Sequence, residues 1–324
     1  MRRRIILGSA IGAAFIAPAP TLTRTPAVLH RPVQILLPFP SDVAYSLARL
    51  IADGISQAVG QPVFIETRSG ATGRVAGEVL KNAAPDGTTL AFFPIAVPVL
   101  APLVFRQLRF DPPRDFLAVT EIARFHYALA VAADHPARSV PEFIAWSRQH
   151  PARASVGTSG AGTISHFFTV MINRAAKAEL LHVPYRNVGV MATDVIGGQI
   201  AGGIDALATL IEFHRAGRLR IIATTHVTRS ALLPAVPTFA EQGLPGVQGV
   251  GWIGVFVPAG TPRPIIDILS RAILQVLRTP QVRDQFAALA VEVTGTSPEE
   301  FAAIIATDTA HWAPIVRASG FSGD

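Results

Sequence analysis

The stretch VQILLPFPSDVAYSLARLIADGISQAVGQPVFI, residues 33–65, decides the fold class. It opens with an apolar run, Val33–Leu37, that stops at a proline, as buried strands of parallel sheets do. Apolar residues then recur at helical spacing until Gly60 and Pro62 end the helix. Val63–Ile65 is expected to be a second strand. A strand, a helix and a second strand in this order predict an α/β fold.

The alternation of strand and helix continues along the rest of the chain. Further strands are expected at residues 88–93, 127–132, 153–156, 180–183, 200–204, 219–225 and 252–257. Helices are expected up to residue 80 and at 141–149, 164–174, 190–196, 207–216, 264–278, 281–289 and 298–318. Two sheets fit this number of strands better than one very wide sheet. We therefore predict two lobes, each with a central mostly parallel sheet, joined by a link near residue 125.

The first residues indicate export. Three arginines at positions 2–4 precede an apolar run over residues 5–19, and no acidic residue occurs before Asp42. A basic start and a short apolar segment are typical of a cleaved signal peptide, not of a membrane anchor. The predicted leader covers residues 1–27, with cleavage either near residue 19 or near residue 27. A twin-arginine signal is an alternative to the general secretory route.

Cysteine content and charge narrow the class of protein further. The 324 residues include no cysteine, so neither disulfides nor a lipid anchor on an N-terminal cysteine is expected. The formal charge is +6, but four of the positive charges are arginines of the leader, at positions 2, 3, 4 and 24, so the mature chain keeps about +2. The remaining basic residues are scattered, apart from the short run 215–220. These features predict a free periplasmic protein that does not bind nucleic acid.

A wholly apolar segment, Phe92–Phe105, contains Pro94, Pro98 and Pro102. Prolines at this spacing would break a membrane-spanning helix repeatedly. The segment is therefore expected to be either a buried loop or the wall of an apolar pocket, and the residues do not decide between the two.

Three polar or glycine-rich loops each join a strand to a helix, at residues 38–43, 67–77 and 157–166. Ligands of open α/β sheets bind beyond the carboxyl ends of the strands, where such loops gather. Free N–H groups and the dipole at a helix start favour an anion such as a carboxylate. Three such loops indicate a ligand site assembled from both lobes.

An enzymatic alternative rests on the third loop. Its residues Gly157–Ala161 approach the nucleophile elbow G-x-S-x-G, with Ser159 as nucleophile and His166 as base, but the last glycine is an alanine. The second loop lacks the Gly-Lys-Ser/Thr ending of a phosphate-binding loop. No histidines pair at metal-ligand spacing, so neither a metal nor a cofactor is expected. The prediction is a protein that is not an enzyme.

From residue 33 onward the sequence resembles the Bug family, the periplasmic receptors of tripartite tricarboxylate transporters. The resemblance rests on the order and spacing of many short motifs. They are LPFP (37–40), ARL (48–50), GQPV (60–63), ETRSGA (66–71), APDG (84–87), FDP (110–112), GTSG (157–160) with His166, HVPY (182–185), GGQ (197–199), Asp205, AGRLR (216–220), LP (233–234), VPT (236–238) and PAGTP (258–262).

The resemblance implies a type II periplasmic-binding-protein fold that closes two lobes over a small carboxylate. Lobe 1 would comprise residues 30–126 and 250–324, and lobe 2 residues 127–249. Main-chain N–H groups, hydroxyls and ordered water would hold the carboxylate, and Asp205 would serve a ligand amino group or the structure of its lobe. The implied ligand-binding residues are Phe39, Pro40, Ser41, Asp42, Ser69, Gly70, Ala71, Thr158, Ser159, Gly160, Gly162, Thr163, His166 and Asp205. The implied partners are the solute and the membrane subunits of a tripartite transporter, and a monomer is expected.

Two departures from the family pattern bear on the solute. The first loop has Ser41-Asp42-Val43 where the family has two glycines, so the backbone there cannot approach a ligand as closely. Asp42 would either cap the following helix or face the cleft. The second departure is Phe93–Val99, where the family has small and polar residues. Residues Phe93–Val97, with Ile95 among them, would give that edge of the cleft an apolar wall. We therefore hypothesise a ligand with at most one carboxylate and an apolar or aromatic body, not citrate. A receptor that serves a membrane sensor kinase remains an alternative.

Overall fold

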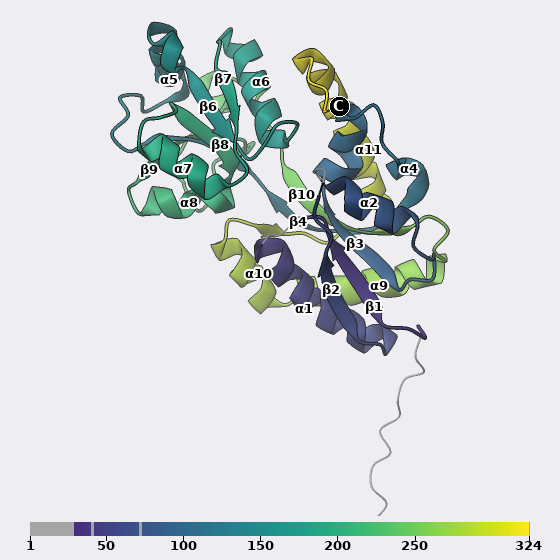
Figure 1. Ribbon diagram of the computed structural model, residues 1–324. Coiled ribbons are helices and arrows are strands. Elements are labelled where there is room, and N and C mark those ends of the chain that lie inside the picture. Colours follow the sequence, from purple (N-terminus) through teal and green to yellow (C-terminus); the bar gives the residue numbers. More distant parts are fainter. Residues whose placement is uncertain (1–28, 40–41, 71–72, 324) are drawn as a thin grey trace, which may run out of the picture.

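The computed structural model of the protein describes residues 29–39, 42–70 and 73–323, without the side chains of Asp42 and Val43. The predicted leader lies outside the described residues, as do Pro40, Ser41 and Ala71. Figure 1 shows two lobes, each built around its own sheet, with β4 and β10 running between them.

Lobe 1 is built on a six-stranded sheet in the order β11-β4-β10-β3-β1-β2. Its strands are β1 (Val33–Leu37), β2 (Val63–Thr67), β3 (Thr89–Pro94), β4 (Phe116–Phe125), β10 (Gly251–Pro258) and β11 (Glu292–Val293). Apolar side chains of α1 (Asp42–Val59) and α9 (Arg263–Leu277) form one core with one face of the sheet, and α10 (Pro280–Ala288) extends it. The other face carries α2 (Arg74–Lys81), α4 (Pro112–Asp115) and the long α11 (Pro298–Ser319).

Lobe 2 is built on a five-stranded sheet in the order β7-β6-β8-β5-β9. Its strands are β5 (Tyr127–Ala132), β6 (Ser155–Thr158), β7 (Leu181–Pro184), β8 (Gly202–Ala206) and β9 (Leu219–Thr224). One face packs on α5 (Val140–Gln149) and α6 (Ile164–Ala176), and the other on α7 (Val188–Ile196) and α8 (Leu207–Arg215). The predicted two-sheet α/β fold is confirmed.

The prediction that both sheets are mostly parallel is wrong in detail. β10 runs antiparallel to β3 and β4, and β5 runs antiparallel to β8 and β9. The reason is the path of the chain between lobes. β5 enters the sheet of lobe 2 directly from β4 of lobe 1, and β10 enters the sheet of lobe 1 from lobe 2 (Figure 1). β5 and β10 therefore point away from the boundary between the lobes, whereas the strands beside them point toward it. The carboxyl ends of β1, β3, β6 and β8 therefore face the boundary between the lobes.

The apolar segment 92–105 is mostly regular structure and not the loop that the sequence allowed, since residues 92–94 end β3 and residues 96–104 are helical. After β3 a wide helical turn covers Ala96–Leu100 and continues as α3 (Ala101–Val104). Val97 and Val99 are buried in the core of lobe 1. Within the described part of the chain, no helix has both the length and the apolar character needed to cross a membrane.

β4, at Phe116–Phe125, was not predicted, because two polar residues interrupt its apolar pattern. Thr120 and Glu121 are both fully buried. Arg124 donates hydrogen bonds to the Glu121 carboxylate, one of them 2.8 Å long from Nη2. Burial raises the pKa of Glu121, and the bonds from Arg124 oppose that shift. A buried carboxylate paired in this way with a partly exposed arginine interrupts the apolar pattern by which a strand is predicted.

The two lobes share part of one hydrophobic core. Trp312 of α11 is 1% exposed, and its ring meets Phe168 of α6 edge-on at 5.7 Å between centroids. Gly249, in the segment that returns to lobe 1, lies against both rings, where an added Cβ would be 3.2 Å from Trp312. On this side the lobes are therefore joined by apolar packing as well as by the chain itself.

A stacked histidine pair lies where the chain first crosses between the lobes. His126 separates β4 from β5, and its ring stacks on His226 with centroids 3.5 Å apart. Neither ring has a hydrogen-bond partner for its buried Nδ1 in the described residues. Burial, followed by the charge of His226, lowers the pKa of His126 to about 3, and burial lowers the pKa of His226 to about 4. Both rings are therefore neutral in the folded protein near pH 7.

We expect His226→Phe to make the protein more resistant to acid. A histidine whose pKa is lower in the folded than in the unfolded state stabilises the fold above about pH 6.5, and this stability is lost as pH falls toward 4. Phenylalanine keeps a stacking ring that does not titrate. Melting temperatures measured from pH 7.5 to 4 should fall less for the variant than for the parent, whereas the exposed-site control His30→Phe should follow the parent. Parallel curves for His226→Phe and the parent would contradict the assignment.

Candidate functional site

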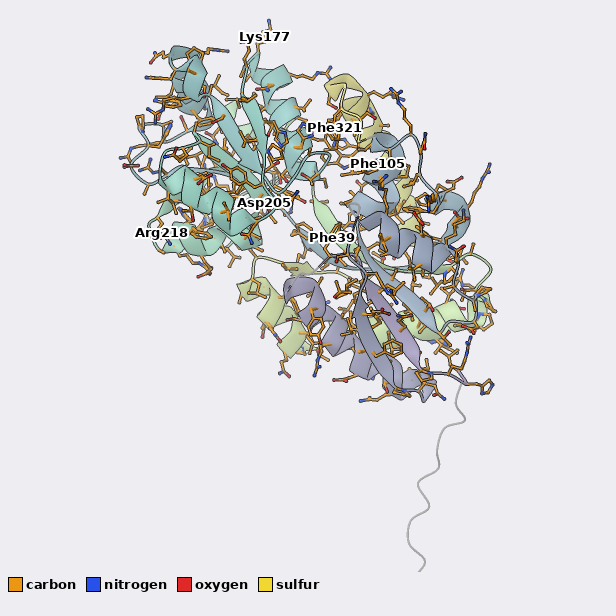
Figure 2. All side chains as sticks on the ribbon, viewed as in Figure 1. Phe39, Phe105, Lys177, Asp205, Arg218 and Phe321 are labelled. Atoms are coloured by element: carbon orange, nitrogen blue, oxygen red, sulfur yellow. The ribbon has the colours of Figure 1, made fainter. Side chains whose placement is uncertain are left out.

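A cavity of about 180 Å³ lies between the two lobes. Lobe 1 contributes the ends of β1 and β3, and lobe 2 contributes the end of β8 and the start of α8. The lining residues are Pro38, Phe39, Ala44, Phe92, Pro94, Phe125, Ile253 and Val291 from lobe 1, with Ala206, Ala208 and Thr209 from lobe 2. Figure 2 shows Phe39 and Asp205 on the facing sides of the two lobes. Among the described lining residues, Thr209 supplies the one polar side chain.

The apolar wall of this cavity comes partly from the segment that the sequence singled out. Phe92 and Pro94 face the cavity from alternate positions of β3. Phe93 points to the opposite face of the sheet, where its ring lies 5.6 Å from that of Phe116. Ile95 is 2% exposed in the core of lobe 1 and does not line the cavity. The wall is therefore narrower than predicted, because alternate residues of a strand point to opposite faces.

The glycine-rich loop of lobe 2 joins β6 to α6. Thr163 caps the helix, since its hydroxyl accepts a hydrogen bond from the N–H of His166 at 3.3 Å. The first-turn N–H groups, at Ile164 and Ser165, have no partner within the helix. Gly160 and Gly162 have φ of 137° and 73°, which side chains rarely tolerate. The loop thus presents backbone donors at the positive end of the helix dipole.

Three hydroxyl groups gather at the same helix start. Ser165 Oγ lies 3.1 Å from Ser159 Oγ and 3.1 Å from Thr163 Oγ1. Ser159 is exposed, whereas Ser165 is 1% exposed. Hydroxyls can donate to an anion without bringing a net charge. The arrangement suits a single carboxylate.

Asp205 connects this loop to the interlobe cavity. Its Oδ1 accepts hydrogen bonds from the N–H of Ala206 at 2.8 Å and the hydroxyl of Thr209 at 3.3 Å. Burial raises the pKa of Asp205, and the Ser159 hydroxyl and the bonds from Ala206 and Thr209 oppose that shift. Its Oδ2 is buried without a hydrogen-bond partner among the described residues. The hydroxyl and the N–H of Ser159 both act on this carboxylate, so Asp205 links the glycine-rich loop to the cavity.

The hydrolase alternative fails on geometry. Ser159 Oγ bonds to Ser165, whereas His166 Nδ1 accepts from the N–H of Gly162 at 3.2 Å and so does not pair with the serine. His166 also stacks on His182, with centroids 4.0 Å apart, and His182 Nε2 lies 2.6 Å from Thr158 Oγ1. Burial lowers the pKa of both rings, to about 4 for His182. The histidine supports the loop and does not activate Ser159.

The loops of lobe 1 are only partly described. Ser69 and Gly70 are exposed after β2, and neither lines the cavity. Pro40, Ser41 and Ala71 lie outside the described residues. α1 begins at Asp42, but the role of its side chain in capping or in the cleft stays a prediction.

Sequence reasoning missed most of the lobe 2 side of the cavity. Ala206, Ala208 and Thr209 sit at the junction of β8 and α8, where no glycine-rich loop draws attention. The usable signal was Asp205, a charged residue at the end of a predicted buried strand. Val291 and Phe125 were missed because they adjoin strands that were not predicted.

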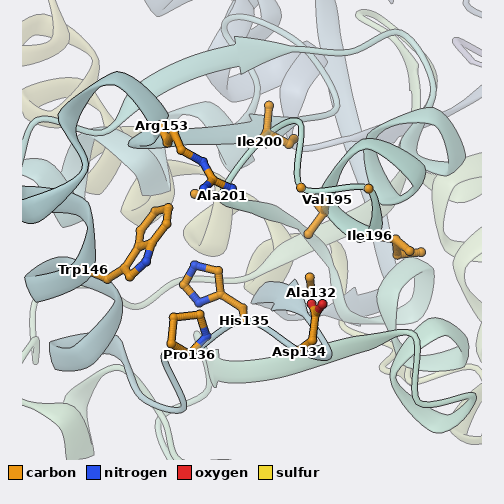
Figure 3. A pocket seen from close by; sticks show the side chains of 12 residues that line it. Ala132, Asp134, His135, Pro136, Trp146, Arg153, Val195, Ile196, Ile200 and Ala201 are labelled. Atoms are coloured by element: carbon orange, nitrogen blue, oxygen red, sulfur yellow. The ribbon is translucent and has the colours of Figure 1, made fainter.

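A second hollow, of about 270 Å³, lies in lobe 2 at the opposite end of its sheet. Figure 3 shows Arg153, Trp146 and His135 pointing into it. The Arg153 guanidinium lies 5.5 Å from the centre of the Trp146 ring. The residues that line this second hollow all belong to lobe 2, and none of them is a predicted site residue. Among the described residues, no group of three or more histidine, cysteine, aspartate or glutamate side chains could hold a metal ion.

Comparison with known proteins gives consistent matches over nearly the whole chain. Residues 47–321 match the model of the tripartite tricarboxylate transporter family receptor. Protein BugT of Bordetella pertussis is 29% identical over 320 residues, which cover 97% of this chain and 96% of BugT. Among solved structures, Rpa4515 of R. palustris with adipate is 30% identical, with a TM-score of 0.81 over 90% of this chain and 98% of that one. MatC from Rhodopseudomonas palustris with bound malate is 28% identical, with a TM-score of 0.78 over 88% and 99% of the two chains.

Proposed function

Because the chain belongs to the tripartite tricarboxylate transporter receptor family, we propose that it binds one small organic carboxylate with an apolar body between its two lobes. The carboxylate would lie at the start of α6, near Ser159, Thr163 and Ser165. The body of the solute would enter the cavity that Phe39, Phe92 and the other lining residues form.

One observation supports this proposal: the loop at the start of α6 and the apolar cavity adjoin the same buried residue, Asp205. Ser159 of the loop stabilises the charged form of Asp205, and Thr209 of the cavity donates a hydrogen bond to it. The Asp205 carboxylate would accept a further hydrogen bond from an amino or hydroxyl group of the solute, or from a water that bridges to it. A polar end and an apolar end of one molecule would be recognised side by side.

The size and chemistry of the cavity favour a small solute with few charges. Its volume of about 180 Å³ is below the roughly 300–1,000 Å³ of sites for drug-sized ligands. Burying a second carboxylate beside these apolar residues would be costly without a paired cation. The related proteins solved with malate and with adipate bind small carboxylates, and adipate has an apolar chain between its two acid groups.

The family consists of solute-binding receptors, which confirms the prediction that the chain is not an enzyme. As further parts of the proposal, the protein is exported by a cleaved leader and delivers its solute to membrane subunits of a tripartite transporter. Genes for a large and a small membrane subunit beside its own would support delivery. An adjacent gene for a membrane sensor kinase would support the signalling alternative instead.

Calorimetric titration of the intact protein with a series of solutes tests the proposed function. Branched or aromatic monocarboxylates, such as 4-methylpentanoate and benzoate, should bind more tightly than citrate. The expected order follows from burial of the apolar body and from the cost of burying extra charges. Tight binding of citrate with no response to the monocarboxylates would overturn the proposed solute class.

A further inference from the structure

The last residues of the chain reach from lobe 1 to the ligand loop of lobe 2. α11 ends at Ser319, and Gly320 turns the chain with φ of 66°. The N–H of Phe321 donates to Ser319 Oγ at 3.1 Å, and the N–H of Gly323 donates to the carbonyl of Val104 at 3.0 Å. Figure 2 shows Phe321 and Phe105 close to the boundary between the lobes. The tail, residues 320–323, is thereby fixed on α3 of lobe 1.

Phe321 meets the loop at Gly162 and His166. Its ring stands edge-on to His166 at 5.1 Å between centroids and 81° between planes. A Cβ added at Gly162 would lie 2.8 Å from this ring and 3.3 Å from Val104. The close approach therefore needs a glycine at position 162, independently of its positive φ. The contact joins the two lobes through the loop itself.

The contact continues from Phe321 through two stacked rings to the other end of the loop. Phe321 meets His166 edge-on, and His166 stacks in turn on His182. His166 Nδ1 also accepts the hydrogen bond from the N–H of Gly162. His182 Nε2 then bonds to Thr158 Oγ1, at the last residue of β6. Thr158 and Gly162, both within the loop 158–163, are thus each hydrogen-bonded to one of the two stacked histidines.

We propose that Phe321 is a positioning residue that fixes the loop 158–163 in the geometry needed to bind the solute carboxylate. It does so through Gly162 and His166 and does not itself contact the solute. A loop that is already ordered loses less conformational entropy when a ligand binds. The role of Phe321 in affinity rests on the proposed function, but its role in ordering the loop does not.

Hydrogen exchange of the intact protein tests the proposal without any ligand. Phe321→Ala should speed exchange of the amides in residues 158–166 and leave those of β5 and β8 unchanged. Phe321→Leu, which keeps an apolar contact of similar volume, should restore slow exchange. Phe64→Ala, at an exposed aromatic of β2 in lobe 1, is the matched control and should match the parent. Unchanged exchange in 158–166 for Phe321→Ala would overturn the proposal.

A calorimetric titration with 4-methylpentanoate adds the consequence for binding. Phe321→Ala should weaken binding about tenfold, and Phe321→Leu should recover most of it. If the loop loosens in Phe321→Ala but no carboxylate binds the parent, the proposed function fails while the positioning role stands. If carboxylates bind and the loop exchanges as in the parent, the positioning role fails alone.

A double variant tests the contact between the ring and the glycine. Gly162→Ala should speed loop exchange, both from its positive φ and from the clash with Phe321. In the Gly162→Ala/Phe321→Ala protein the clash is gone, so the combined effect should be smaller than the sum of the two single effects. Strictly additive effects would contradict direct contact between these residues.

Discussion

Ser159→Asp is expected to weaken carboxylate binding at least about 100-fold. The variant places a negative charge at the helix start where the proposal puts the solute anion. Two like charges about 4 Å apart at an effective dielectric constant of 20 repel by roughly 4 kcal/mol. About 1.4 kcal/mol corresponds to each factor of ten in affinity. Calorimetric titration with the best monocarboxylate measures the loss directly.

Ser159→Asn is the control for this prediction, because asparagine has the shape of aspartate without the charge. It should bind within about tenfold of the parent, since it replaces one neutral polar group with another. Because the Ser159 hydroxyl also acts on the buried Asp205 carboxylate, circular dichroism and melting temperatures of both variants check that they fold before affinities are compared. Equal affinity of the Asp and Asn variants would place the carboxylate away from the start of α6.

The largest effect on stability is expected for Trp312→Ala. This side chain of α11 is 1% exposed, and its ring packs against Phe167 and Phe168 of α6 in lobe 2. Removing a buried tryptophan leaves a cavity and typically costs about 3–5 kcal/mol. The free energy of unfolding, measured in a denaturant titration followed by circular dichroism, should fall by this amount.

Trp146→Ala serves as the comparison for the tryptophan prediction. Trp146 is half-buried at the far end of lobe 2, where its ring stacks on His150 with centroids 4.6 Å apart and meets His135 edge-on. Its loss should cost clearly less than that of Trp312. A cost below about 1 kcal/mol for Trp312→Ala would mean that the shared core contributes little to the stability of the protein.

The sequence predicted elements whose signals are local. Val33–Leu37 is an apolar run between turn residues, and the structure makes it β1 with the same bounds. The direction of β5 and β10 could not be predicted, because it depends on where the chain crosses between lobes. β4 was missed because the charged residues Glu121 and Arg124, which pair with each other, are the residue types expected on an exposed segment. The pattern of apolar and polar residues therefore predicts neither the direction of a strand that crosses between lobes nor a strand that contains a buried, paired charge.

In the candidate site, too, the residues with local sequence signals were predicted and those placed by tertiary packing were not. The loop of Ser159 and Thr163 was found from its glycines and hydroxyls, which act through the local backbone. Ile95 was placed on the cavity wall, yet it lies in the core, since the strand pleat and the helical turn after Pro94 decide which side chains face the cleft. Thr209 was missed because only the packing of α8 against lobe 1 brings it to the cavity.

Calorimetric titration with a carboxylate and its own amide tests the central claim most directly. The two compounds, 4-methylpentanoate and 4-methylpentanamide, share one apolar body and differ in the charged group that the start of α6 would hold. The account predicts that the carboxylate binds at least about 100-fold more tightly than the amide, since hydrogen bonds to charged groups are worth about 1.5–3 kcal/mol each. Equal affinities, or tight binding of citrate in place of both, would contradict it.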